Sequence, residues 1–285
     1  MKNILVTGGK GQLASCIKDV SANLDNLNFI YVDIDQLDIT DMKSVITFFK
    51  NNSVSYCINC AAYTAVDKAE SNKEFAERVN VLGAKNLAIA CESNGAVLIH
   101  ISTDFVFDGM QTKLYDEKDK ANPLSVYGMT KLNGELVIAD VLKEHIIIRT
   151  SWLYSEHGQN FLKTMIKLGS ERDSLSVVAD QIGTPTYAGD LAKTIVTIIG
   201  EEKTNYGTYH YSNEGVASWY DFAKAIFDIR EITVALSPIK TEAYPTPAIR
   251  PRYSVMDKSK IKEELQFNIP YWRDSLEVCL KRLKN

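Results

Sequence analysis

Short apolar runs alternate with helix-like segments along the first half of this 285-residue chain. The runs are continuously apolar, which is typical of parallel strands buried on both faces of a sheet. The predicted strands are residues 3–6, 28–32, 56–60, 96–101 and 146–148. The predicted helices extend to Val20 after the first strand and then cover residues 42–50, 73–92 and 127–142. This order predicts a doubly wound, Rossmann-like α/β domain.

The pattern changes after about residue 152. Helical spacing persists in residues 161–168, 190–199 and 219–229, but the links between these segments are polar or, at 244–251, rich in proline. We therefore expect a first domain of residues 1–152. Residues 153–285 should form a smaller lobe that closes over the open end of the sheet and returns some segments to it.

Composition and charge exclude several classes of partner. A formal net charge of −4 and a pI of about 5.7 argue against a nucleic-acid binder, which needs a basic face. No apolar run approaches the roughly 20 residues of a membrane span, and the start of the chain is too weakly apolar for a signal peptide. The expectation is a cytoplasmic protein with neither nucleic-acid nor membrane partners.

Cysteine usage gives no sign of a metal centre. Cys57 and Cys60 form a C-x-x-C, but they lie within an apolar run and have no second ligand pair at zinc-site spacing. The preferred interpretation is two small side chains in a buried strand. We predict no metal site from these residues.

A glycine-rich turn follows the first predicted strand. Gly8, Gly11 and Ala14 form G-x-x-G-x-x-A, which allows a sharp turn, a close approach of backbone to a pyrophosphate and tight helix packing. The following helix presents free N–H groups to the phosphates. Asp33 ends the second strand at the distance expected for a ribose contact. Asp33 would repel a 2′-phosphate whereas Lys10 would attract one, so NADH and NADPH both remain candidates.

A phenol and an amine lie one helical turn apart further along. Tyr127 and Lys131 stand at i and i+4, hence on one face of a helix. A free tyrosine has a pKa of about 10, and a neighbouring cation favours the phenolate. A hydroxyl at the end of the preceding strand, from Ser102 or Thr103, could hold a substrate carbonyl or the phenol. Together with the glycine turn, this pair indicates a nicotinamide-dependent reductase of a ketone.

At this point the chain resembles the extended short-chain dehydrogenase/reductase family, and within it the dTDP-4-dehydrorhamnose reductases. The residues that carry the resemblance are N-C-A-A-Y-T-A-V-D-K-A-E at 59–70, S-T-D-F-V-F-D-G at 102–109, R-T-S-W-L-Y at 149–154, D-Q-I-G-T-P-T at 180–186, and A-Y-P-T-P-A at 243–248 with R-P at 250–251. These motifs reach from the first third of the chain almost to its end.

The resemblance implies NADPH- or NADH-dependent reduction of the 4-keto group of dTDP-4-dehydro-L-rhamnose to dTDP-L-rhamnose, used for polysaccharide. It implies a catalytic set of Thr103, Tyr127 and Lys131. With the glycine-turn residues, the cofactor set becomes Gly8, Lys10, Gly11, Gln12, Leu13, Asp33, Asp38, Ile39, Ala62, Tyr63, Thr64, Tyr127 and Lys131. Thr103, Asp104 and Trp152 would contact the sugar, and Arg250 would pair with the diphosphate through its planar fork.

Two other functions remain open at this stage. A 4-ketoreductase that makes a different deoxysugar would need only a few changed pocket side chains. A non-catalytic dinucleotide-binding subunit, resembling the regulatory subunit of methionine adenosyltransferase, would not need the intact set of Thr103, Tyr127 and Lys131. A 4,6-dehydratase is disfavoured because Phe105, and not glutamate, follows Asp104. Some relatives are homodimers with magnesium between subunits, but no matching acidic cluster can be assigned in this sequence.

Overall fold

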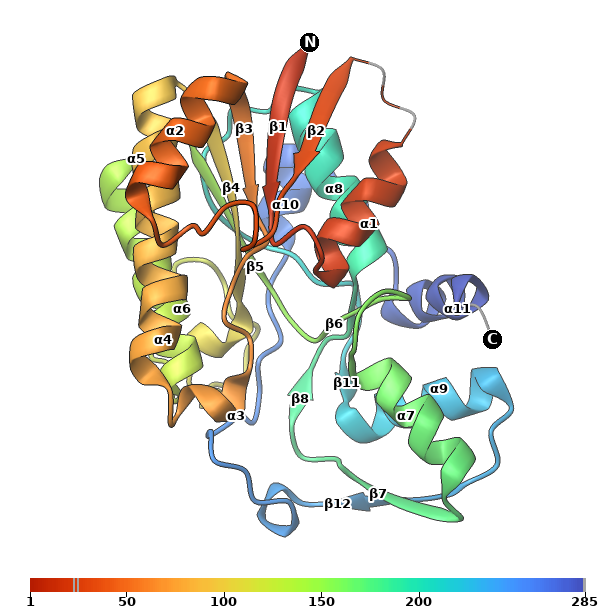
Figure 1. The fold of residues 1–285 in the computed structure, drawn as a ribbon. Coiled ribbons are helices and arrows are strands. Elements are labelled where there is room, and N and C mark those ends of the chain that lie inside the picture. Colours follow the sequence, from red (N-terminus) through yellow and green to blue (C-terminus); the bar gives the residue numbers. More distant parts are fainter. Residues whose placement is uncertain (23, 25, 284–285) are drawn as a thin grey trace.

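Six parallel strands form the central sheet of the computed structural model, which describes residues 1–22, 24 and 26–283 (Figure 1). The strands are β1 (Lys2–Thr7), β2 (Leu27–Tyr31), β3 (Val54–Asn59), β4 (Val97–Thr103), β5 (His145–Thr150) and β10 (Gly207–His210). Their order is β10-β5-β4-β3-β1-β2, and each neighbouring pair runs parallel. The doubly wound, Rossmann-like α/β fold predicted from the sequence is confirmed.

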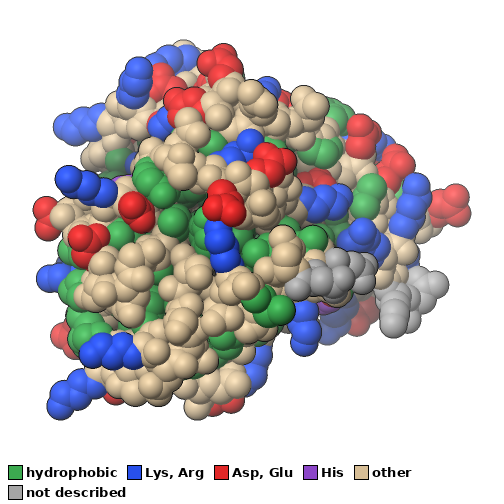
Figure 2. All heavy atoms as spheres, turned by 90° about the horizontal axis from the view of Figure 1, so that it is seen from above, with side chains coloured by type: hydrophobic (Ala, Val, Ile, Leu, Met, Phe, Trp, Pro, Cys, Tyr) green, Lys and Arg blue, Asp and Glu red, His purple; other side chains and the backbone are tan. Residues whose placement is uncertain are grey.

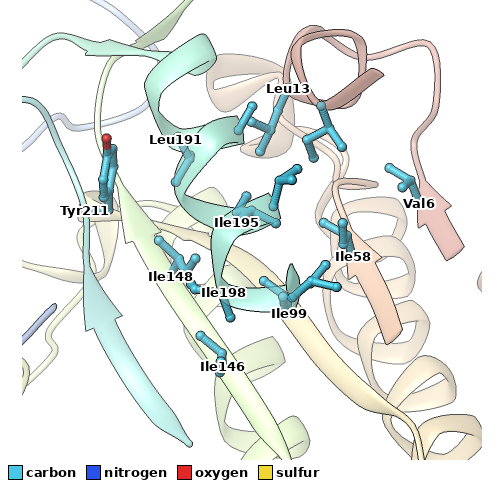
Figure 3. Close-up of a cluster of buried hydrophobic side chains, with 14 of the residues drawn as sticks. Val6, Leu13, Ile58, Ile99, Ile146, Ile148, Leu191, Ile195, Ile198 and Tyr211 are labelled. Atoms are coloured by element: carbon cyan, nitrogen blue, oxygen red, sulfur yellow. The ribbon is translucent and has the colours of Figure 1, made fainter. Parts of the chain in front are cut away.

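Helices cover both faces of this sheet (Figure 1). One face carries α2 (Met42–Asn52), α4 (Lys73–Glu77), α5 (Ala84–Asn94) and α6 (Val126–Val141); the other carries α1 (Gln12–Ser21), α8 (Ala188–Gly200) and α10 (Ser259–Leu265). Successive strand residues point to opposite faces, so Ile146 and Ile148 pack toward α8 (Figure 3). Ile147 lies between them in sequence and joins the core on the other face. This double burial explains why the strands are continuously apolar.

A smaller group of elements lies beyond the carboxyl ends of the strands (Figure 1). Its helices are α7 (Phe161–Glu171), α9 (Trp219–Arg230), α11 (Trp272–Arg282) and the 3-10 turn η3 (Thr241–Ala243). Its strands form three pairs: β6 (Leu153–Tyr154) with β9 (Thr186–Tyr187), β7 (Ser174–Val178) with β12 (Ala235–Ile239), and β8 (Ile182–Gly183) with β11 (Ala217–Ser218). These elements have a hydrophobic core of their own. The chain also returns to the large sheet through α8 and β10, and the domain boundary at residue 152 stays a prediction.

One predicted helix has a more complex form. The segment predicted as a helix over 73–92 consists of α4, the π-helix η1 (Arg78–Gly83) and α5 in succession. The short α3 (Val66–Ala69) precedes it, and the 3-10 turn η2 (Asp104–Val106) follows β4. A π-helical turn inside a helix often accompanies a functional site, because it turns side chains out of the regular helical register.

Figure 2 shows acidic and basic side chains interspersed among the described residues of the face seen from above. No helix in the described part of the chain is long and apolar enough to cross a membrane.

Candidate active site

A cavity of about 790 Å³ lies at the carboxyl ends of the parallel strands. Loops from neighbouring strands meet at this edge, where open α/β sheets bind their ligands. Most of the residues predicted for cofactor, catalysis and substrate line it: Gly8, Gly11, Gln12, Leu13, Asp33, Asp38, Ile39, Ala62, Tyr63, Thr64, Thr103, Asp104, Tyr127, Lys131, Trp152 and Arg250. Lys10 is not among the lining residues.

The glycine turn after β1 leaves the backbone exposed to the cavity. Gly8 has a φ of +63°, and a Cβ there would lie 2.8 Å from the backbone nitrogen of Ala61. Gly11 caps α1 without any side-chain hydrogen bond, so the first N–H groups of the helix stay available. Gln12, the first residue of α1, donates from Nε2 to the carbonyl of Leu153 at 3.2 Å and so joins the turn to the second lobe.

Asp33 folds back onto this glycine turn. Its carboxylate accepts hydrogen bonds from the backbone N–H of Lys10 at 3.0 Å and of Ile34 at 2.7 Å. The Lys10 side chain is exposed and points to Asp35, with Nζ 3.0 Å from a carboxylate oxygen. The structure therefore brings Asp33 into the cavity wall and leaves the Lys10 ammonium outside it.

The π-helix η1 supports a loop that sequence reasoning did not connect with it. Asn80 is buried in η1, and its side chain accepts from the N–H of Tyr63 at 2.8 Å and donates to the Tyr63 carbonyl at 3.2 Å. It also donates to the Thr130 hydroxyl on α6 at 3.0 Å. Asn80 thus fixes the loop after β3 against the helix that carries Tyr127 and Lys131. Its partners are distant in sequence, so no local motif marked it.

The start of α6 is held tightly against the end of β4. Ser125 caps the helix, its hydroxyl accepting from the N–H of Gly128 at 3.1 Å. A Cβ on Gly128 would lie 2.2 Å from the carbonyl oxygen of Phe105, so only glycine permits this approach. The Phe105 ring meets the Tyr127 ring edge-on at 5.6 Å. This contact places the phenol beside the end of β4.

Burial dominates the electrostatics of the phenol. It raises the pKa of Tyr127 to about 12, although a hydrogen bond with the Thr103 hydroxyl acts in the opposite direction. The sequence predicted a lower pKa because of Lys131, and that effect does not prevail. The reason is the direction of the amine, which donates to the Ile101 carbonyl at 2.6 Å. A phenol that keeps its proton at neutral pH is suited to donate it.

Two further buried groups flank the phenol. Burial lowers the pKa of Lys131 to about 8, with Glu135 and Cys60 acting against the shift. Burial raises the pKa of Asp104 to about 6, partly offset by hydrogen bonds with Ser254 and Thr103. The Thr103 hydroxyl donates to Asp104 at 3.1 Å. Of the two hydroxyls that the sequence left open, that of Thr103 hydrogen-bonds with the phenol, whereas that of Ser102, a residue that also lines the cavity, donates to Glu135.

An aromatic wall closes the far end of the cavity. Trp152 has a left-handed backbone with a φ of +46°, and its indole stacks on Trp219 with ring centroids 3.6 Å apart. The indole also lies against Gly183, where a Cβ would lie 2.7 Å from the ring. Trp219 and its neighbour Phe161 also line the cavity and were not predicted, because they meet Trp152 only in the folded chain.

Arg250 reaches the cavity but already has an acidic partner. Its guanidinium donates twice to the Asp67 carboxylate, at 3.1 and 2.8 Å, and once to the Ala248 carbonyl at 3.1 Å. The pair ties the proline-rich segment near residue 250 to α3 and lowers the pKa of Asp67. The fork that was predicted to bind a diphosphate is thus already paired with a carboxylate.

Three side chains capable of binding a metal meet elsewhere. Among the described residues, ligand atoms of Asp19, Glu156 and His157 lie within 4.8 Å of one another. None of the three lines the cavity. That the site holds no metal stays a prediction, and a dependence on magnesium stays open.

Comparison with known proteins agrees with this geometry. The family model described as the RmlD substrate binding domain matches residues 1–285. The dTDP-4-dehydrorhamnose reductase of Aggregatibacter actinomycetemcomitans is 39% identical, covering 97% of this chain and 98% of that protein. The crystal structure of the Clostridium acetobutylicum dTDP-4-dehydrorhamnose reductase has a TM-score of 0.95 at 43% identity, covering 99% of both chains. The Bacillus anthracis enzyme, solved in complex with NADP, also has a TM-score of 0.95, at 39% identity, covering 99% of this chain and 100% of that one. The resemblance seen in the sequence is confirmed: the chain belongs to the dTDP-4-dehydrorhamnose reductase family.

Proposed function

We propose that this chain reduces the 4-keto group of dTDP-4-dehydro-L-rhamnose, using NADPH or NADH, and forms dTDP-L-rhamnose. The observation that carries the proposal is the common cavity, which brings a glycine turn, a protonated phenol and an aromatic wall together. Curated relatives at 35–39% identity bear this reductase name over nearly their full length. We also propose that the enzyme works in the cytoplasm, on a small nucleotide-sugar substrate, and that it forms a homodimer.

The glycine turn fits a dinucleotide. A side chain at Gly8 would collide with the backbone after β3, so glycine is what lets these two backbone segments lie close together in the cavity wall. The free N–H groups at the start of α1 suit a pyrophosphate, and Asp33 suits a ribose hydroxyl. We assign the adenosine side of the cavity to Asp33, Asp38 and Ile39, and the middle to the 62–64 loop. A bound nicotinamide would supply the hydride for the ketone carbon.

Tyr127 supplies the proton in this scheme. Its phenol holds a proton at neutral pH and can give it to the oxygen of the ketone as negative charge develops there. The Thr103 hydroxyl, which donates to Asp104 in the structure, would turn its one proton to the same oxygen and hold it by a hydrogen bond. Once the phenolate forms, the positive charge of Lys131, one helical turn away, would stabilise it. Lys131 would also reach the ribose of the cofactor.

The sugar would lie between Asp104 and the aromatic wall. Trp152, which lines the cavity, would offer apolar ring atoms to the methyl group of a deoxysugar. Asp104, with its raised pKa, can exchange hydrogen bonds with a sugar hydroxyl in either protonation state. For Arg250 we propose contact with the diphosphate, for which it would share its fork between the phosphate and Asp67.

Turnover with an identified product tests the proposal directly. The purified chain is mixed with dTDP-4-dehydro-L-rhamnose and NADPH or NADH, and loss of the reduced cofactor is followed by absorbance. NMR of the product then gives the configuration at C4. We expect dTDP-L-rhamnose. A different C4 epimer would indicate another deoxysugar reductase, and dinucleotide binding without turnover of any keto sugar would indicate a binding subunit.

The charge of Asp33 should control the choice of cofactor. We expect Asp33→Asn to raise the ratio of kcat/KM for NADPH over NADH about tenfold or more, because it removes a charge that repels the 2′-phosphate and one charged hydrogen bond to the ribose. Steady-state kinetics with both cofactors measure the ratio. Asp35→Asn, which frees Lys10, should shift the ratio in the same direction but less, since that pair is exposed. An unchanged ratio in Asp33→Asn would remove Asp33 from the ribose site.

The packing of Trp152 against Gly183 should control sugar binding. Gly183→Ala puts a methyl group 2.7 Å from the indole and must displace it. Overpacking of this kind costs about 1–3 kcal/mol, so we expect the KM for the keto sugar to rise roughly tenfold while cofactor affinity stays the same. Gly200→Ala is the control, because nothing lies within 4 Å of that added carbon. Equal KM values in the two variants would mean that Trp152 does not contact the sugar.

A further inference from the structure

A row of buried polar side chains lies behind Lys131, outside the cavity lining. It consists of Thr7, Asn59 and His100, which are direct neighbours across β1, β3 and β4. Their exposed fractions are 1%, 2% and 1%. Thr7 and Asn59 are the last residues of β1 and β3, and because all three side chains are buried, each needs a hydrogen-bond partner. We call these three residues the polar row.

The polar row ends on the amine that supports the phenol. The Thr7 hydroxyl donates to the Asn59 side-chain oxygen at 2.7 Å. The Asn59 side-chain nitrogen lies 3.0 Å from Nδ1 of His100. Nε2 of His100 lies 3.2 Å from Nζ of Lys131, which also donates to the Ile101 carbonyl. One continuous chain of hydrogen bonds therefore joins Thr7 to the amine.

The hydrogen bonds of the polar row can run in either of two directions. A neutral imidazole has one donor nitrogen and one acceptor nitrogen. If Asn59 donates to Nδ1, the ring proton sits on Nε2 and points at Lys131, whose nitrogen must then accept as an uncharged amine. If Lys131 is an ammonium, it donates to Nε2; the ring proton then sits on Nδ1 and Asn59 turns its oxygen toward the ring.

We infer that His100 is a positioning residue for Lys131, and that the polar row changes the tautomer of His100 whenever the amine gains or loses its proton. The balance is one proton: the amine takes one from solvent or gives one up, and the ring keeps a single proton that changes nitrogen. The row thereby offers a matched partner to both charge states of Lys131. The inference rests on the proposed function only for the role of Lys131 beside Tyr127.

The groups around this pair are compatible with a neutral ring. Lys131 is faced by Glu135 on its own helix, by Cys60 after β3 and by His100 on β4. Burial keeps the pKa of His100 well below its usual value, and the positive charge of Lys131 adds to this effect. His100 therefore changes its tautomer and not its charge over the range in which Lys131 titrates.

Nitrogen NMR of the free protein tests the tautomer without any turnover. With ¹⁵N-labelled histidine, we expect His100 to carry its proton on Nδ1 at low pH and on Nε2 at high pH, with a midpoint near the Lys131 pKa of about 8. His100→Asn identifies the signals, and Lys131→Met should leave one tautomer at every pH. A single tautomer throughout in the unmodified protein, or the same change in Lys131→Met, would overturn the inference even if the enzyme is an active reductase.

Two substitutions of His100 test the hydrogen bonds of Nδ1 and Nε2 separately. The amide of His100→Gln reaches the place of Nε2 and can still meet Lys131, whereas the amide of His100→Asn reaches only the place of Nδ1. A hydrogen bond from a charged donor is about twice as strong as a neutral one. We expect kcat to fall at high pH as Lys131 loses its proton. His100→Asn should move the midpoint of this fall down by about half to one pH unit, whereas His100→Gln should leave the midpoint in place.

The unfolding temperatures of both variants are measured beside these pH profiles. Each variant loses one of the two hydrogen bonds of the ring, so both should lose similar stability. Equal pH profiles in the two variants would mean that His100 only fills space in the sheet, and would overturn its role as a positioning residue. An upward shift in His100→Asn would do the same. If the unmodified chain shows no turnover, the proposed function fails, and the NMR measurement still decides the inference.

Discussion

Replacing Tyr127 by phenylalanine should lower kcat about 10²- to 10⁴-fold, the contribution expected of a positioned proton donor. The phenol lies in the cavity wall beside the Thr103 hydroxyl and holds a transferable proton at neutral pH. Phenylalanine keeps the edge-on packing against Phe105, so the fold and the KM for the cofactor should change little. Single-turnover kinetics with the keto sugar and reduced cofactor measure the loss in the chemical step itself.

Tyr154→Phe is the matched control for that change. Tyr154 is also buried, and its hydroxyl has no hydrogen-bond partner among the described residues, but it does not line the cavity. Its removal should leave kcat unchanged within a factor of about two. If Tyr127→Phe kept most of the activity while Lys131→Met abolished it, the proton would come from another group, and Asp104 would be the next candidate because of its raised pKa.

The local sequence pattern was sufficient to predict features that depend on residues close together along the chain. Strands β4 and β5 are covered by helices on both faces, so nearly every residue in them is buried and the apolar runs stand out. Gly8 is similar, since its left-handed φ and the nearby backbone of Ala61 both require glycine. The helical spacing of Tyr127 and Lys131 needed nothing but the period of α6.

Contacts between distant segments could not be predicted in this way. Asn80 holds Tyr63, and His100 meets Lys131, but neither residue belongs to a motif that points to its partner. Trp219 faces Trp152 only because the chain folds back after β11. Such residues carry the geometry of the site, and their partners are set by the fold alone.

Charge alone was also an incomplete guide. Arg250 was assigned to a diphosphate from its chemistry; the fold also pairs it with the carboxylate of Asp67, and the diphosphate contact stays a prediction. Lys10 likewise stands beside Asp35, outside the cavity lining. The expected fall in the Tyr127 pKa failed for a related reason, because burial outweighs a cation whose hydrogen bonds point elsewhere. The distance and burial of a group decide its electrostatic effect.

The second large effect should appear in stability. Arg149 on β5 and Glu135 on α6 form an ion pair whose side chains are 8% and 4% exposed, joined by a hydrogen bond of 2.6 Å. Arg149→Met leaves the carboxylate buried without its partner, which costs about 3–5 kcal/mol. In a chain of this size we expect the unfolding temperature to fall by roughly 10 °C, at about 2–4 °C per kcal/mol. Differential scanning calorimetry measures the change.

Two further variants separate the buried charge from the lost side chain. Arg252→Met removes an ion pair with Glu242 that is 67% and 63% exposed, and should shift the unfolding temperature by no more than about 1–2 °C. Arg149→Met combined with Glu135→Leu should recover most of the loss, because apolar residues often replace a buried pair without cost. If the double variant is as unstable as Arg149→Met, the cost arises from the packing of Arg149 against Phe107 and not from an unpaired carboxylate. Recovery would instead show that the pair's role is to allow Glu135, one turn beyond Lys131, to keep its charge inside the protein.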